Sequence, residues 1–182
     1  MRKSSGALAQ TKPAHLGERS VARILGLDPG YGRLGYGCIE ETKGKLHAVE
    51  FGCIETPKGE DHAMRLREVH EQLGDLLQRL KPSVVGVESL FFSKNVKTAL
   101  AVGEARGVIL LTLAQHNLSV AELSPQEVKM AVTGYGKAEK RQVQQMVMKI
   151  LGLAKPPQPD DAADALALAI ALSAMQKFLS KM

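Results

Sequence analysis

The sequence predicts one α/β domain in which a mixed five-stranded sheet is flanked by helices. Three observations lead to that prediction. The 182 residues suit a single domain. Three consecutive apolar runs with short turns lie between residues 23 and 54 and predict antiparallel strands. From residue 61 on, segments with a helical period alternate with short apolar runs, which predicts parallel strands joined by helices.

The three antiparallel strands are bounded by turn residues. The first strand runs from Arg23 to Asp28 and ends at Pro29-Gly30. The second covers Gly35 to Glu40 and the third covers Leu46 to Ile54, with a turn near Lys43-Gly44 between them. These strands should form an antiparallel meander at one edge of the sheet.

Helices and parallel strands fill the rest of the domain. Apolar residues that recur every three or four positions from Asp61 predict a helix that ends at Lys81-Pro82. The run Val84 to Glu88 should be a central parallel strand. Ser124-Pro-Gln-Glu127 has the form of a capping box, which begins a helix. The other expected elements are a helix that ends near residue 116, a strand over 118–123, a helix over about 138–151 and a last helix from 160.

Positive charge is concentrated at the N-terminus. The chain carries a net charge of +5, and residues 1–23 supply +4 of it, because five basic residues there face one acidic residue. The segment is also polar and aperiodic. We therefore expect residues 1–22 to be a disordered basic extension of a domain that spans residues 23–178.

The sequence shows no sign of a membrane protein or of a disulfide framework. The longest uncharged apolar stretch, Ala165 to Met175, is shorter than a membrane span. The N-terminal segment lacks the apolar core of a signal peptide. Cys38 and Cys53 lie in apolar runs without metal-ligand spacing, so we expect buried, reduced thiols. These features predict a soluble, cytoplasmic protein.

Four acidic residues stand where a folded sheet would gather them. Asp28 ends the first predicted strand and Glu88 ends the fourth, and ligand crevices form at such strand ends. Asp161 and Asp164 are three residues apart at the start of the last helix, and so share one face of its first turn. If that helix end meets the strand ends, four carboxylates converge. Their hard oxygen ligands suit Mg²⁺ or Mn²⁺.

Other interpretations of the single acids remain open. Asp160 or Asp161 could be the N-cap of the last helix, and Asp28 could be an ordinary turn residue. Glu88 is harder to explain without a partner, because a charge directly after an apolar strand should be nearly buried. The glycine-rich segment at Gly136-Lys137 lacks the P-loop pattern, and we discount it as a nucleotide site.

Four segments resemble those of one bacterial family. ILGLDPGYGRLGYG, VVGVESLFFSKN, ALAVGEARGV and PPQPDDAADALALAIA are similar to the RuvC family, the Holliday junction resolvases of the ribonuclease H-like superfamily. The likeness runs from about Arg23 to about Met175. It implies a ribonuclease H-like fold. It also implies a homodimer that makes paired symmetric nicks in four-way DNA junctions during recombination and repair, and leaves 5′-phosphate and 3′-hydroxyl ends.

The resemblance assigns a role to the four acids. Asp28, Glu88, Asp161 and Asp164 align with the family's catalytic carboxylates. In that role they would also be the metal ligands for two Mg²⁺ ions, with Mn²⁺ as a substitute. Some family members carry histidine at the position of Asp161. This chain carries an acid there, so imidazole chemistry is excluded at this position.

Aromatic and basic residues near the acids are candidate DNA contacts. Phe91 and Phe92 follow Glu88 closely, and an exposed ring beside an active site can stack on unpaired bases. Core packing is the alternative for at least one ring. The segment 94–149 is locally basic, and its basic side chains are either solvated surface or phosphate contacts. The predicted DNA-binding residues are Phe91, Phe92, Lys94, Lys129, Lys137, Lys140 and Arg141. Phe91 aligns with the family's base-stacking phenylalanine, and Lys129 and Lys140 match basic positions implicated in the family.

The resemblance also implies protein partners. The helix after residue 96 carries a stripe that is either core or part of the dimer interface, formed by Ala99, Val102, Val108 and Leu111. The branch-migration proteins RuvA and RuvB are the other expected partners. The N-terminal extension is either a basic arm that adds nonspecific DNA affinity or the product of a start codon assigned upstream of the true one.

Two other functions remain as alternatives. One is a related ribonuclease H-like nuclease of the YqgF type, against which the Phe91-Phe92 pair and the complete acid set argue. The other is a junction-binding module without catalysis. Sugar kinases and actin-like ATPases open with a similar strand and turn, but they need two such domains and about twice this length.

Overall fold

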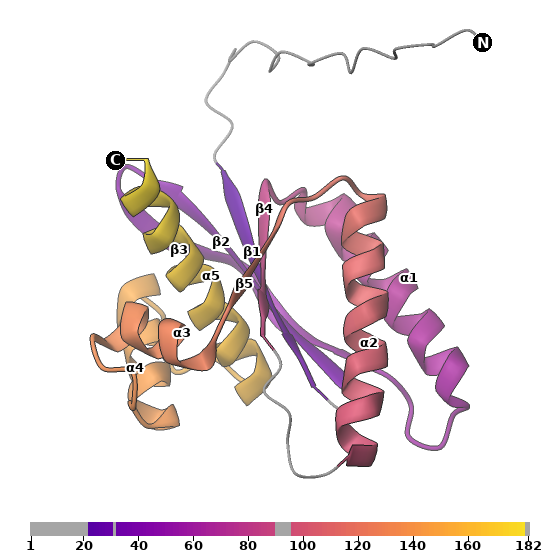
Figure 1. The fold of residues 1–182 in the computed structure, drawn as a ribbon. Coiled ribbons are helices and arrows are strands. Elements are labelled where there is room, and N and C mark those ends of the chain that lie inside the picture. Colours follow the sequence, from indigo (N-terminus) through magenta and orange to yellow (C-terminus); the bar gives the residue numbers. More distant parts are fainter. Residues whose placement is uncertain (1–21, 31, 90–95, 181–182) are drawn as a thin grey trace, which may run out of the picture.

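A five-stranded sheet separates two layers of helices in the computed structural model, which describes residues 22–30, 32–89 and 96–180 (Figure 1). The elements are β1 (Arg23–Pro29), β2 (Arg33–Thr42), β3 (Lys45–Glu55), α1 (His62–Leu80), β4 (Val84–Glu88), α2 (Val96–Gln115), β5 (Val120–Leu123), α3 (Pro125–Thr133), α4 (Lys140–Leu151) and α5 (Asp160–Leu179). Helices α1 and α2 cover one face, and α3, α4 and α5 cover the other. The kinds of element and their order are those predicted. Apart from Ala22, the predicted extension lies outside the described residues.

The sheet has the predicted mixed topology. Its strand order is β3-β2-β1-β4-β5, in which β1–β2 and β2–β3 are antiparallel pairs while β1–β4 and β4–β5 are parallel pairs. Strand β4 lies between two parallel neighbours, as its unbroken apolar run predicts. Because β1 and β4 are parallel, their carboxyl ends meet at the same edge of the sheet.

Several element boundaries differ from the prediction, each for a local reason. Strand β1 extends to Pro29, because Pro29 still pairs with Leu34. Strand β5 begins at Val120 and not at Leu118, because the Leu118 amide donates to Leu113 O (3.1 Å) and completes the end of α2. Helix α4 begins at Lys140 and not near Ala138, whose amide closes a turn of its own. The capping box between Ser124 and Glu127 is confirmed.

Helix α5 lies directly on the sheet because two glycines leave room for its backbone. A Cβ on Gly26 would lie 2.0 Å from Ala165 O, and a Cβ on Gly35 would lie 2.3 Å from Asp161 O. No side chain larger than hydrogen fits at either position. The two glycines therefore fix the height and position of α5 above β1 and β2.

The core divides into two layers, one on each side of the sheet. Leu25 and Leu27 of β1 are fully buried on the α1 and α2 side, whereas Ile24 packs with α5 on the other side.

Among the described helices, α5 alone has the length and apolar composition of a membrane span, with a mean hydropathy of 1.4. However, 61% of this apolar stretch is buried inside the domain, as expected of a core helix.

Both cysteines are free thiols. Cys38 is buried as predicted, but Cys53 is only half-buried, so the prediction of a buried thiol there is wrong.

Candidate active site

Asp28 and Glu88 leave the sheet side by side. In the parallel β1–β4 pair, Leu27 is in register with Val87, so the next residue on each strand is an acid at the same edge. The two carboxyl groups share a hydrogen bond, and both side chains are half-buried. The prediction that the strand ends bring these acids together is therefore confirmed.

The N-terminal end of α5 supplies the other two acids, Asp161 in its first turn and Asp164 just beyond it. In the β1–β2 pair, Asp28 is opposite Gly35, the residue on which the Asp161 backbone rests. The N-cap of α5 is Pro159, which makes no side-chain cap hydrogen bond. The N-cap interpretation of Asp160 or Asp161 is therefore wrong, since both lie inside the first turn.

Three of the four predicted acids line one pocket. Asp28, Glu88 and Asp164 share a cavity of about 190 Å³ with the side chains of Lys129 and Lys140. Its other walls are apolar and come from α3, α4 and α5. The Lys140 Nζ is 3.0 Å from Asp164 Oδ2 and 3.3 Å from Oδ2 of the neighbouring Asp160.

Asp161 lies at the edge of this arrangement and not in the pocket lining. Its Oδ2 accepts a hydrogen bond from Arg33 Nη1 at 3.2 Å, and the Cys53 thiol is 4.0 Å from the same oxygen. In the described part of the chain, no three Asp, Glu, His or Cys side chains are already grouped closely enough to hold a metal ion. The structure thus places the four acids around one edge of the sheet, with three of them sharing a cavity.

Burial and mutual repulsion perturb the acids of the pocket. Desolvation, followed by the charge of Glu88, raises the pKa of Asp28 to about 8. Desolvation also raises the pKa of Glu88 and of Asp164, while the nearby lysine charges act in the opposite direction on both. A buried carboxyl cluster of this kind is stabilised by protons or by cations. Acids with raised pKa values in a cleft are candidates for a functional site.

The predicted DNA contacts divide into three groups. Lys129, which is half-buried, and Lys140 line the acid pocket. Lys137 and Arg141 are exposed and lie outside it. Phe91, Phe92 and Lys94 fall outside the described residues.

Two arginines near the acids were not singled out from the sequence. Arg33 donates a hydrogen bond to Asp161 from the start of β2. Arg106 lies in the locally basic segment, but its side chain is only 13% exposed; it pairs with Glu122 at 2.7 Å and donates to Glu88 O at 3.4 Å. Arg106 therefore supports the end of β4 and does not belong to an open basic surface. No sequence spacing signals either contact, because both join distant segments.

Comparisons with known proteins show which family and which fold the chain shares. The family model described as "Crossover junction endodeoxyribonuclease RuvC" matches residues 24–172. A protein of that name from Moorella thermoacetica is 54% identical over 147 residues, which cover 81% of this chain and 88% of that protein. The Thermus thermophilus RuvC structure has a TM-score of 0.79 at 33% identity and covers 86% of this chain and 96% of that one. The structure of Thermus thermophilus RuvC in complex with Holliday junction substrate has a TM-score of 0.78 at 30% identity, with the same coverage.

The sheet order, the acid pocket at the ends of β1 and β4 and these structural likenesses define a protein of the ribonuclease H-like class. Within that class, the chain belongs to the RuvC family of crossover junction endodeoxyribonucleases.

Proposed function

We propose that this chain is a Holliday junction resolvase, a crossover junction endonuclease that cuts two opposing strands of a four-way DNA junction during recombination and repair. The cuts leave 5′-phosphate and 3′-hydroxyl ends. The observation that carries the proposal is the pocket in which Asp28, Glu88 and Asp164 face Lys129 and Lys140, in a chain of the RuvC family. The likeness to a RuvC structure with a Holliday junction substrate supports the choice of DNA.

The acids of the pocket suit a hard divalent cation. Carboxylate oxygens are the ligands that Mg²⁺ and Mn²⁺ prefer, and the raised pKa values of Asp28, Glu88 and Asp164 reflect a cluster that a cation would stabilise. We propose that these three acids and Asp161 hold two Mg²⁺ ions, with Mn²⁺ as a substitute. Such ions supply an activated water for in-line attack on phosphorus and stabilise the leaving oxygen.

Lysines at the pocket are suited to bind the DNA backbone on either side of the cut. Lys129 and Lys140 project into the same cavity as the acids, so a phosphate drawn to them lies next to the carboxylates. The exposed Lys137 and Arg141 extend the positive charge along the surface. For the segment beyond Glu88, the proposal is that Phe91 or Phe92 stacks on an unpaired base and that Lys94 contacts phosphate.

Paired cuts require two active sites, and α2 offers a surface for a second copy of the chain. Leu100 is 64% exposed and Leu111 is 57% exposed, and a Cβ on Gly103 or Gly107 would meet nothing within 4 Å. These residues lie three to four apart along one face of the helix, so an apolar face without a described partner faces outward. The interpretation of the stripe as core is therefore wrong for Leu111. We propose a homodimer through this face, acting in the cytoplasm beside RuvA and RuvB.

The test is cleavage of a synthetic four-way junction labelled on each strand in turn, with Mg²⁺ or with EDTA, beside a linear duplex of the same sequence. We expect paired, ligatable nicks in the junction alone and only with metal. Glu88→Gln should bind the junction without cutting it, because it removes a ligand and a negative charge that faces phosphate. Tight binding without cutting by the wild-type chain, in Mg²⁺ and in Mn²⁺, would contradict the proposal and favour a non-catalytic binding module.

A further inference from the structure

Arg33 connects one of the four acids to the edge of the sheet. Its Nη1 donates to Asp161 Oδ2 at 3.2 Å, and its Nη2 lies 3.5 Å from Glu55 Oε1. Arg33 and Glu55 are cross-strand partners at the ends of β2 and β3. Arg33 therefore contacts two carboxylates at once, Asp161 through Nη1 and Glu55 through Nη2.

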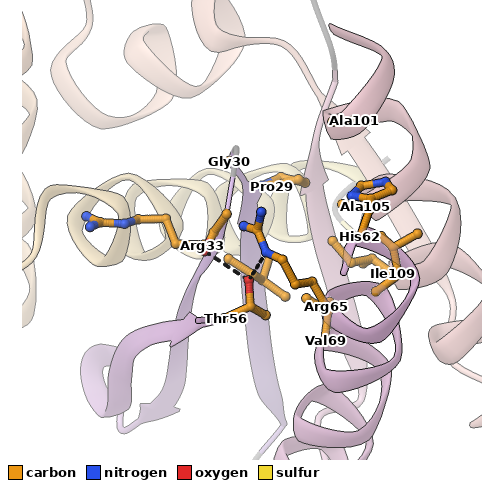
Figure 2. A pocket seen from close by; sticks show the side chains of 13 residues that line it. Pro29, Gly30, Arg33, Thr56, His62, Arg65, Val69, Ala101, Ala105 and Ile109 are labelled. Atoms are coloured by element: carbon orange, nitrogen blue, oxygen red, sulfur yellow. Dashed lines mark hydrogen bonds between the residues drawn. The ribbon is translucent and has the colours of Figure 1, made fainter. Parts of the chain in front are cut away.

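The turn that carries Arg33 is itself fixed from the α1 side of the sheet. Gly32 O accepts from the amide and the hydroxyl of Thr56, each at 3.4 Å, and Arg65 Nε donates to the Thr56 hydroxyl at 2.9 Å. Gly32 has a φ of 83°, and a Cβ there would lie 2.6 Å from Arg65 Nη2. Figure 2 shows Thr56 and Arg65 below the turn, with the Arg33 side chain directed away from them. Both the backbone and the guanidinium of Arg33 are thus held in place.

Within the described part of the chain, the Asp161 carboxylate is held through one of its two oxygens. Oδ2 accepts the Arg33 hydrogen bond, while Oδ1 accepts no hydrogen bond from any other described residue. The backbone of Asp161 is fixed as well, since it rests against Gly35. An acid with one oxygen bound by a guanidinium and the other unused has the form of a metal ligand with an outer-sphere partner.

We propose that Arg33 is a positioning residue for Asp161, which orients this carboxylate toward the metal-binding acids through the chain Glu55–Arg33–Asp161. The inference rests on the proposed function, because it assigns Asp161 to the metal site. In this role Arg33 acts through Asp161 and not on the reacting atoms. Its side chain is 45% exposed, so its ion pairs contribute little to folding stability and its removal leaves the fold intact.

The first test is the affinity for Mn²⁺, measured by electron paramagnetic resonance on the full chain without DNA. Arg33→Ala should weaken Mn²⁺ binding about 10-fold, because loss of an outer-sphere partner lowers metal affinity by about 10- to 100-fold. Arg33→Lys should recover part of the affinity, since an ammonium can still donate to Oδ2. Arg79→Ala is the matched control, because Arg79 pairs with Glu50 and lines neither the acid pocket nor the Gly32 turn. It should bind Mn²⁺ as the wild type does.

The sign of the change separates positioning from simple charge. Deleting a positive charge next to the acids would by itself make a cation bind more tightly. Tighter or unchanged Mn²⁺ binding by Arg33→Ala would therefore overturn the proposal, and weaker binding supports it. Glu55→Gln should weaken binding in the same direction but less, because the guanidinium keeps its bond to Asp161 and loses only its second anchor.

A second measurement separates this inference from the proposed function. At saturating junction, Arg33→Ala should lower kcat at a fixed Mg²⁺ concentration and should shift the Mg²⁺ dependence of cleavage upward. Junction affinity in EDTA should stay within a few-fold of the wild type. If the wild-type chain does not cut junctions at all, the proposed function fails, while the Mn²⁺ titration still decides the role of Arg33.

Discussion

Replacing Gly35 by alanine should push α5 away from the sheet at the point where it carries Asp161. The added Cβ would lie 2.3 Å from Asp161 O and 2.6 Å from the carbonyl carbon, and both are backbone atoms of a packed helix. Ordinary contact begins at 3.4 Å, so the two backbones must separate by about 1 Å. Forcing extra volume into a well-packed core destabilises a protein by about 1–3 kcal/mol.

Thermal unfolding and junction cleavage measure the two consequences of that shift. For a domain of this size, about 1–3 kcal/mol lowers the midpoint of unfolding by about 2–12 °C. Displacing Asp161 by about 1 Å should reduce cleavage on the order of 100-fold, since catalytic geometry tolerates little misplacement.

The matched control for Gly35→Ala is Gly74→Ala in α1, where an added Cβ would meet only His116 Cε1 at 3.8 Å. Alanine is favoured over glycine inside a helix, so this variant should be more stable by up to about 1 kcal/mol and should cut normally. A Gly35→Ala protein with the wild-type midpoint and full activity would refute the described contact between α5 and β2.

Three further predictions follow from the site and from α2. The raised pKa of Asp28, about 8, means that the folded state binds a proton more tightly than the unfolded chain does, so the contribution of Asp28 to stability is lost as pH rises from about 4 to about 8. Asp28→Asn should therefore become more stable relative to the wild type as pH rises through that window in EDTA. In denaturant titrations, the difference in unfolding free energy between the two proteins should grow by up to about 1.4 kcal/mol per pH unit, and a constant difference would contradict the assignment. Lys129→Ala should weaken junction binding and lower the slope of log affinity against log salt by about 1. Lys149→Ala is the control and should change neither, because Lys149 is exposed in the last turn of α4 and lies outside the pocket. Leu111→Glu should convert the dimer to monomers in sedimentation experiments, and an unchanged dimer would exclude the exposed face of α2 as the interface.

The sheet and the strand-end acids could be predicted because each depends on short-range patterns. The run Val84 to Glu88 shows at once that a strand is buried and that a charge ends it. Asp28 follows an equivalent run, and parallel pairing then brings the two acids to one edge. The spacing of Asp161 and Asp164 places both on one face at the start of a helix. None of these steps needs a measured distance.

What could not be predicted depends on how separate elements meet. The pairing of Asp161 with Arg33 requires the register of β2 against β3 and the height of α5 above Gly35, and no local pattern encodes either. The burial of Arg106 has the same origin, because its partners lie on β4 and β5. The sequence does offer one signal that the sheet and α5 approach closely. Gly26 and Gly35 have no side chain, and they face a helix rich in alanine.

Two cations flank the first turn of α5, and their surroundings indicate different roles. Lys140 comes from the start of α4 and lines the cavity with the acids, so a phosphate that enters the cavity meets its ammonium group. Arg33 comes from the edge of β2, where Glu55 and Asp161 hold its guanidinium and a hydrogen-bonded turn holds its backbone. Because both its backbone and its guanidinium are held, Arg33 should keep its orientation when DNA and metal bind. A positioning residue requires this. Lys140 can instead exchange a carboxylate for a phosphate, which is what a DNA contact requires.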